Sequence, residues 1–134
     1  MDITLQTGIV HYKIRDERKN IIAEFDLNPG DISAVRRLQQ IDAELKNYRL
    51  PDTENAGNDI AECEQYLESR FDYLLGYEAS KDIFKRYSPL TPLENQWFFQ
   101  AVLTQIELLI GSGVAERSKK IAEQIDEALK SLNE

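Results

Sequence analysis

Few side chains in this sequence are of the types that carry out catalysis. The chain has one histidine, His11, and one cysteine, Cys63. His11 alternates with apolar residues in a strand-like segment, so we interpret it as an exposed strand residue. Cys63 lies on the apolar face of an expected helix, where a thiol is usually buried and unreactive. One residue of each type cannot assemble a zinc site of the usual His and Cys kind within a single chain.

Carboxylates and glycines are more numerous, but their spacing is not that of a known site. Glu62, Glu64 and Glu68 recur on one expected helix, and paired carboxylates can exchange protons or bind a hard cation. No Asp-rich loop closed by a glutamate accompanies them, so their spacing is typical of a solvated helix face. The six glycines form neither a G-x-G-x-x-G nor a Walker A pattern. We therefore expect no enzymatic activity, no cofactor and no metal site.

Two apolar groups are candidates for binding another protein. The three consecutive aromatic residues at 97–99 cannot all face one way on a helix, so two are expected in the core and one partly exposed. Alternatively, the outward ring anchors a protein partner. Farther along, apolar residues spaced by four, four and three form a narrow seam that lies on the core or pairs with another helix. The candidate partner-binding residues are Trp97, Phe98, Phe99, Ile121, Ile125, Leu129 and Leu132.

Composition limits the class of protein. A chain of 134 residues is expected to form a single domain, residues 1–134. Its formal net charge of −8 repels phosphate backbones and anionic lipids, which makes nucleic acid and membranes poor partners. The N-terminus lacks a signal-peptide pattern, no apolar run approaches the length of a membrane span, and one cysteine permits no internal disulfide. These features predict a cytoplasmic protein.

The first 30 residues are expected to form a β-hairpin. Apolar and polar residues alternate over 10–15 and again over 21–27, which is typical of half-buried strands. The polar segment 16–20 between them would be the hairpin loop. Ile3 and Leu5 alternate in the same way, so a third strand before Thr7 is an alternative.

Residues 31–134 are expected to form a bundle of three to five helices. Asp31 would cap a helix of about 18 residues ended by Pro51, and a flexible loop is expected at 52–58. A second helix would start with a capping box at Asp59 and end at Gly76, and a short helical turn would span 80–86. Thr91, Pro92 and Glu94 predict the start of the next helix, which Gly111-Ser112-Gly113 would break or bend. The predicted fold class is therefore α+β, mainly α.

Several of these segments, in this order, resemble a family of small siphophage tail proteins from phages of Gram-positive hosts. The resembling pieces are residues 25–31 (Phe-Asp-Leu-Asn-Pro-Gly-Asp) after the hairpin, residues 71–76 (Phe-Asp-Tyr-Leu-Leu-Gly), Ser80 with Phe84, and residues 88–92 (Ser-Pro-Leu-Thr-Pro) before the aromatic run. Each piece is short, and their order and spacing over about residues 9–125 carry the resemblance. The family's members are regarded as tail assembly chaperones, and their architecture is a β-hairpin followed by a helical bundle.

The resemblance implies a function without catalysis. Tail assembly chaperones bind the tape measure protein, a long helical and partly hydrophobic chain, and keep it soluble while tail tube subunits assemble around it. It further implies a homo-oligomer that contacts other tail proteins in the host cytoplasm. The Gly111-Ser112-Gly113 interruption is not a feature of that family, so a different packing of the last helix is an open alternative. Two alternatives remain open: a structural tail or connector component, and a small acidic regulator that binds another protein.

Overall fold

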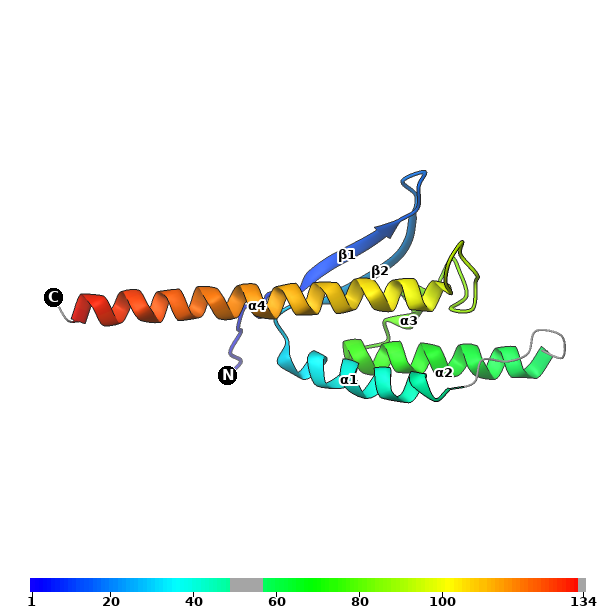
Figure 1. Cartoon of the computed structure of the whole chain (residues 1–134), viewed down its shortest axis with the longest axis horizontal. Helices are drawn as coiled ribbons and strands as arrows, with labels where there is room; N and C mark the ends of the chain where they lie inside the picture. Colours follow the sequence, from blue (N-terminus) through cyan, green and yellow to red (C-terminus); the bar gives the residue numbers. More distant parts are fainter. Residues whose placement is uncertain (49–56, 133–134) are drawn as a thin grey trace.

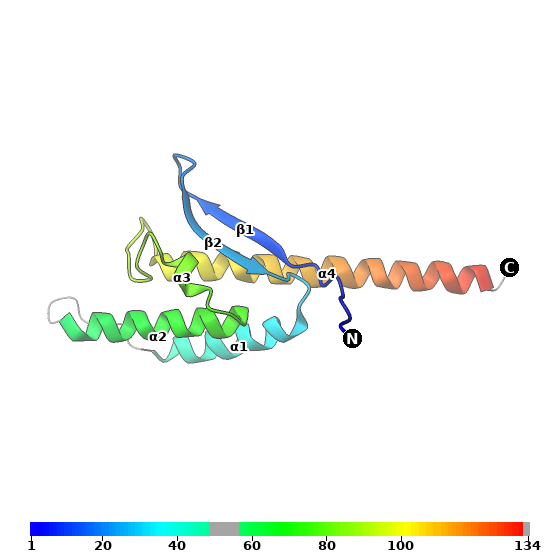
Figure 2. The same ribbon diagram turned by 180° about the vertical axis from the view of Figure 1, so that it is seen from behind.

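The computed structural model of the chain describes residues 1–48 and 57–132, with the backbone alone at 57 and 58. Within these residues a two-stranded antiparallel hairpin is followed by four helices, so the predicted α+β, mainly α, fold is confirmed. The long helix α4 (Phe98–Leu132) runs along the long axis of the molecule and projects beyond the other elements at its C-terminal end (Figure 1). The hairpin lies on one side of α4, and helices α1 and α2 lie on the other, as the reverse view also shows (Figure 2).

The hairpin pairs β1 (Val10–Arg15) with β2 (Ile21–Leu27). The carboxylate of Asp16 accepts hydrogen bonds from the backbone N–H groups of Arg18 and Asn20, both at 2.9 Å, which closes the predicted loop. The alternative of a third strand is wrong, because none of residues 1–9 pairs with the sheet. Gly8 has a φ of +85°, and this turn directs the preceding segment away from the hairpin.

Helices α1 (Ile32–Lys46) and α2 (Gly57–Leu75) run antiparallel to each other. The predicted cap of α1 is confirmed, since the Asp31 carboxylate accepts a hydrogen bond from the Ser33 N–H at 2.9 Å. The expected start of α2 at Asp59 is wrong, because the helix already includes Gly57. Within the loop expected at 52–58, residues 52–56 lie outside the described part of the chain, as does the expected stop at Pro51. Gly76 comes directly after α2 with a φ of +80°, as its predicted role requires.

The predicted short helical turn is present as α3 (Ser80–Ile83), where the Asp72 carboxylate accepts a hydrogen bond from the Ser80 N–H at 2.7 Å. The expected helix start at Thr91 is wrong. A loop forms there instead, in which Pro92 and Trp97 make an isolated antiparallel bridge. Gln100 Oε1 accepts a hydrogen bond from the Trp97 N–H at 3.0 Å, so α4 is capped from inside its own first turn.

Helix α4 continues without interruption through Gly111-Ser112-Gly113, so the expected break there is wrong. Glycine at position 113 is explained by a close contact with a distant segment and not by a break in the helix. A Cβ atom at Gly113 would lie 2.6 Å from the carbonyl carbon of Pro29, whereas one at Gly111 would meet no atom within 4 Å. Glycine at 113 therefore lets the turn before α1 lie directly against the helix.

The core lies where the hairpin and α1 to α3 meet the first half of α4. Phe71, Phe84 and Phe98 pack edge to face, with ring centroids 5.0 and 6.0 Å apart. Cys63 and Ile83 are fully buried in the same core, and no polar or charged side chain is buried among the described residues. The interior is therefore entirely apolar.

Helix α4 also corrects the expectation that no apolar segment approaches the length of a membrane span. An 18-residue window within it has a mean hydropathy of 1.4, so α4 is long and apolar enough to cross a membrane by those two criteria. Charged residues recur from Glu116 onward, which places that window on the first half of the helix. The same half supplies six buried residues to the core, and 39% of the apolar window is buried in the structure.

Candidate protein-binding surface

The aromatic run at the start of α4 lies mostly inside the molecule. Phe98 and Phe99 are 1% and 5% exposed, whereas Trp97 is half-buried. This matches the arrangement with two rings in the core and one partly outside. In this conformation Phe98 and Phe99 offer almost no surface to a partner, and only Trp97 remains accessible.

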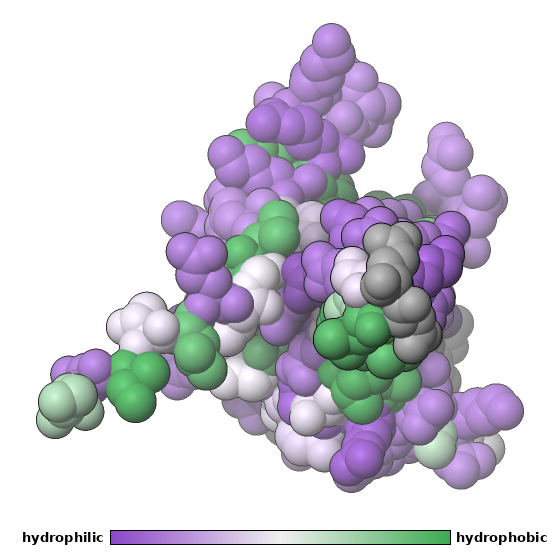
Figure 3. Space-filling view, turned by 90° about the vertical axis from the view of Figure 1, so that its left-hand side faces the viewer, coloured by the Kyte–Doolittle hydropathy of each residue, from purple (hydrophilic) through white to green (hydrophobic). Residues whose placement is uncertain are grey.

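The apolar seam of α4 lies on the surface. Ile121, Ile125, Leu129 and Leu132 are 57%, 55%, 53% and 81% exposed. Every residue from 118 to 132 is exposed, because this half of the helix extends beyond the rest of the molecule (Figure 1). Seen from the C-terminal end of α4, hydrophobic side chains gather on one flank of the helix and hydrophilic ones cover the other flanks (Figure 3). We call these four residues the α4 seam.

Two contacts hold α4 in place just before the seam begins. Gly113 lies against Pro29, and the Arg117 guanidinium reaches across the same turn. Arg117 Nη2 donates a hydrogen bond to the Gly8 carbonyl at 3.0 Å, and Nη1 donates to the side-chain oxygen of Asn28. The helix is therefore fixed to the body up to residue 117, and residues 118–132 have no tertiary support from the described part of the chain.

Charged side chains flank the seam along this free half. Lys119, Lys120 and Lys130 are basic, and Glu123, Asp126 and Glu127 are acidic. An exposed apolar stripe between charged flanks is the pattern of a helix that pairs with another helix. The seam is therefore the strongest candidate in this chain for binding a second polypeptide.

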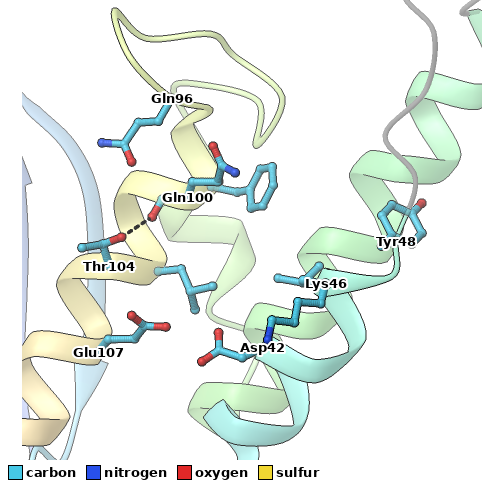
Figure 4. Close-up of a pocket in the computed structure, with 10 residues that line it drawn as sticks. Asp42, Lys46, Tyr48, Gln96, Gln100, Thr104 and Glu107 are labelled. Atoms are coloured by element: carbon cyan, nitrogen blue, oxygen red, sulfur yellow. Dashed lines mark hydrogen bonds between the residues drawn. The ribbon is translucent and has the colours of Figure 1, made fainter.

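A groove of about 600 Å³ lies between α1 and the start of α4, and Figure 4 shows the side chains that line it. Asp42 and Glu107 face each other across it from the two helices. Burial, together with the charge of the Asp42 carboxylate, raises the pKa of Glu107 above its ordinary value. A pair of carboxylates can exchange protons, but no other feature of this groove identifies a substrate or reaction, so we assign it no chemistry.

The histidine and the cysteine lie on different elements and do not form a catalytic pair. His11, exposed on β1, has its two ring nitrogens 3.0 Å from Glu24 Oε1 and 2.7 Å from Asp26 Oδ1. Cys63 is 1% exposed, and burial raises the pKa of its thiol, which disfavours the reactive thiolate. Burial also raises the pKa of the neighbouring Tyr48 to about 12. The described residues contain no group of three His, Cys, Asp or Glu side chains placed to hold a metal ion.

One exposed apolar segment was not identified as a surface from the sequence. Ile3, Leu5 and Ile9 are 84%, 78% and 65% exposed on the N-terminal segment. The alternation of Ile3 and Leu5 suggested a third strand, but residues 1–9 form no strand and these side chains lie on the surface.

Comparisons with protein-family models, with curated proteins and with solved structures give no match for this chain.

Proposed function

We propose that this chain is a non-enzymatic phage tail assembly chaperone that binds the tape measure protein through the α4 seam and self-associates during tail assembly in the host cytoplasm. The observation that carries the proposal is the exposure of this seam on a helix that extends beyond the folded body. The resemblance to siphophage tail proteins supplies the identity of the client.

The client's chemistry matches the surface. A tape measure protein is a long helix with apolar stripes, and a helix with an apolar face can dock along another apolar helix face. Such a client aggregates when its stripes are free, so a chaperone must cover them and stay soluble itself. Exposed Ile and Leu side chains supply the first property, and a net charge of −8 supplies the second.

Co-expression with the tape measure protein of the same phage genome tests this function. Its gene would be a neighbouring reading frame of several hundred residues with long helical periodicity. We expect the chain to keep that protein in the soluble fraction, and Ile125→Glu to abolish this effect. Leu108→Glu is a matched control, because Leu108 is 60% exposed on the same helix but lies away from the seam.

Two results would contradict the proposal. One is a tape measure protein that stays equally insoluble with and without the chain. The other is recovery of the chain in stoichiometric amounts from purified phage particles, which would favour the alternative of a structural tail component.

A further inference from the structure

The outer edge of β1 is open within the described part of the chain. On β2, the Asp26 N–H donates a hydrogen bond to the Tyr77 hydroxyl at 2.6 Å, so it points away from β1. Outward-pointing pairs and hydrogen-bonded pairs alternate along an antiparallel ladder. His11, opposite Asp26, and Lys13, two residues farther on, therefore also direct their N–H and C=O groups away from the partner strand. These backbone groups make no hydrogen bond outside the hairpin to any described residue.

The outer edge of β2 is covered instead. Helix α3 packs beside this strand, and the Tyr77 hydroxyl occupies the edge at Asp26. Of the two edges of the hairpin, that of β1 is therefore the one available to a further strand in the described structure. An open edge of this kind is a template for pairing with another extended chain.

Residues 2–6 have the pattern of the strand that this edge lacks. Ile3 and Leu5 alternate with the polar residues Asp2, Thr4 and Gln6. Both apolar side chains are free in a single copy, at 84% and 78% exposure. When extended, these five residues span about 17 Å, close to the length of the six-residue β1.

Within one copy this segment is held away from the edge. Gly8 has a φ of +85°, and its carbonyl accepts a hydrogen bond from Arg117 Nη2 at 3.0 Å. The N-terminal segment ends on the opposite side of α4 from the hairpin (Figures 1 and 2). With these contacts intact, residues 2–6 can reach the β1 edge of another copy but not their own.

We propose that residues 2–6 of one copy add to the outer edge of β1 in a second copy as an antiparallel third strand, with Asp2 opposite Arg15 and Thr4 opposite Lys13. Self-association is part of the proposed function, on which this strand exchange rests, and the β1 edge is the surface that serves it. Reciprocal exchange closes a dimer, and successive exchange builds a chain of copies through the same pair of strands.

The apolar side chains fit this register. Ile3 would lie opposite Ile14 and Leu5 opposite Tyr12, on the face of β1 that packs against the core. An open groove of about 1080 Å³ lies beside Ile14 and reaches the first turns of α4, with apolar side chains of β1, β2 and α4 in its lining. The donated strand would therefore move two exposed aliphatic side chains out of water.

Charge favours residues 2–6 over a second β1 strand as the partner. His11, Lys13 and Arg15 line the exposed face of β1. Two β1 strands paired edge to edge in antiparallel order would set Lys13 opposite one of these same three residues, and opposed like charges destabilise a sheet. The donated strand instead brings the Asp2 carboxylate to Arg15, which takes part in none of the ion pairs between described residues.

Charge also favours the antiparallel direction. In the parallel direction, a single register brings both apolar side chains beside Tyr12 and Ile14. That register sets Asp2 opposite His11. The His11 ring already lies 3.0 and 2.7 Å from two carboxylates of β2, so a third carboxylate there would be repelled.

Cysteine cross-linking tests the register. In a Cys63→Ala background, the Thr4→Cys and Lys13→Cys variants are mixed and oxidised. We expect a mixed 4–13 disulfide, because hydrogen-bonded pairs in an antiparallel sheet have Cα atoms about 5.5 Å apart, within the range of a disulfide. Lys85→Cys is the matched control: Lys85 is exposed beside the covered edge of β2, so this variant should not link to Thr4→Cys.

Sedimentation velocity of the full chain tests the association itself. At about 100 µM protein we expect wild-type species heavier than the 15.5 kDa of one chain. Ile3→Asp should weaken this association by about 10-fold or more, because its carboxylate would be placed against the apolar groove beside Ile14. Ile125→Glu, which alters the α4 seam alone, should associate as the wild type does.

A monomer at all concentrations, association unchanged by Ile3→Asp, or a Lys85→Cys control that links as readily as Lys13→Cys would overturn the inference. Failure of the proposed function has a different signature. Copies joined by the 4–13 disulfide that leave the tape measure protein insoluble would refute the function and retain the strand exchange.

Discussion

The contact between Gly113 and Pro29 predicts opposite effects for two substitutions that are two residues apart on one helix. Alanine is favoured over glycine by about 1 kcal/mol within a helix. At Gly111 the added methyl group would meet no atom within 4 Å, so the full gain should appear. We expect Gly111→Ala to raise the melting temperature by about 3–5 °C, the shift expected for that energy in a domain of this size.

At Gly113 the same gain is opposed by a clash with backbone. The added Cβ would lie 2.5 Å from Pro29 Cβ and 2.6 Å from the Pro29 carbonyl carbon, and the turn at Pro29 cannot move without disturbing the start of α1. Overpacking of this kind costs about 1–3 kcal/mol. Because that exceeds the helical preference, we expect Gly113→Ala to lower the melting temperature by several degrees.

Thermal unfolding followed by circular dichroism measures both variants, at one fixed protein concentration so that self-association contributes equally. If Gly113→Ala stabilised the protein as much as Gly111→Ala, the helix would not lie against Pro29, and the account of the uninterrupted α4 would be wrong.

Three further predictions concern side-chain contacts. The hydrogen bonds that the His11 ring donates to the Glu24 and Asp26 carboxylates raise the pKa of His11. Their stabilisation is therefore fully present below pH 6.5 and is lost as the pH rises through the folded-state pKa; urea unfolding across pH 5–9 should show this loss in the wild type and not in His11→Gln. The raised pKa of Glu107 acts in the same direction, because its contribution to the stability of the folded state is present below about pH 4.5 and is lost as the pH rises. At pH 7, Glu107→Gln should therefore stabilise the protein by about 0.5–1 kcal/mol in urea titration. Equal stabilisation by the exposed control Glu116→Gln would contradict this. Arg117→Ala removes the hydrogen bonds to Gly8 and Asn28, so proteolysis within residues 1–9 should become faster, and an unchanged rate would show that Arg117 does not hold this segment.

The features that were predicted correctly from the sequence depend on neighbouring residues. Asp31 caps α1, Gly76 ends α2 in a left-handed conformation, and the hairpin forms around Asp16 because each needs only the few residues beside it. The alternation of apolar and polar residues, from which the two strands were predicted, is also a local pattern. Such features can be predicted from a short window of sequence.

The features that were missed depend on residues far apart in the chain. Gly113 marks a contact with Pro29 rather than a break, and no local pattern distinguishes these two uses of glycine. The capping pattern at Thr91 is overridden because the Thr91 carbonyl instead accepts a hydrogen bond from the Phe98 N–H at 2.8 Å, which closes a loop.

The sequence left open whether the apolar seam is covered by the core or exposed. The answer depends on how far α1 and α2 extend beneath α4, and this is a property of the whole fold. The structure places the seam beyond the contacts at Gly113 and Arg117, so it is on the surface, and its role in binding remains a proposal.

Hydrogen exchange over residues 118–132 tests most directly whether the α4 seam binds another polypeptide. A helical segment of this length without tertiary contacts is marginally stable in water and exchanges rapidly. We predict fast exchange in the wild-type chain alone, slow exchange when the tape measure protein is bound, and fast exchange under both conditions in Ile125→Glu. Equally fast exchange in the wild type and in Ile125→Glu, in the presence and absence of the tape measure protein, would contradict the account.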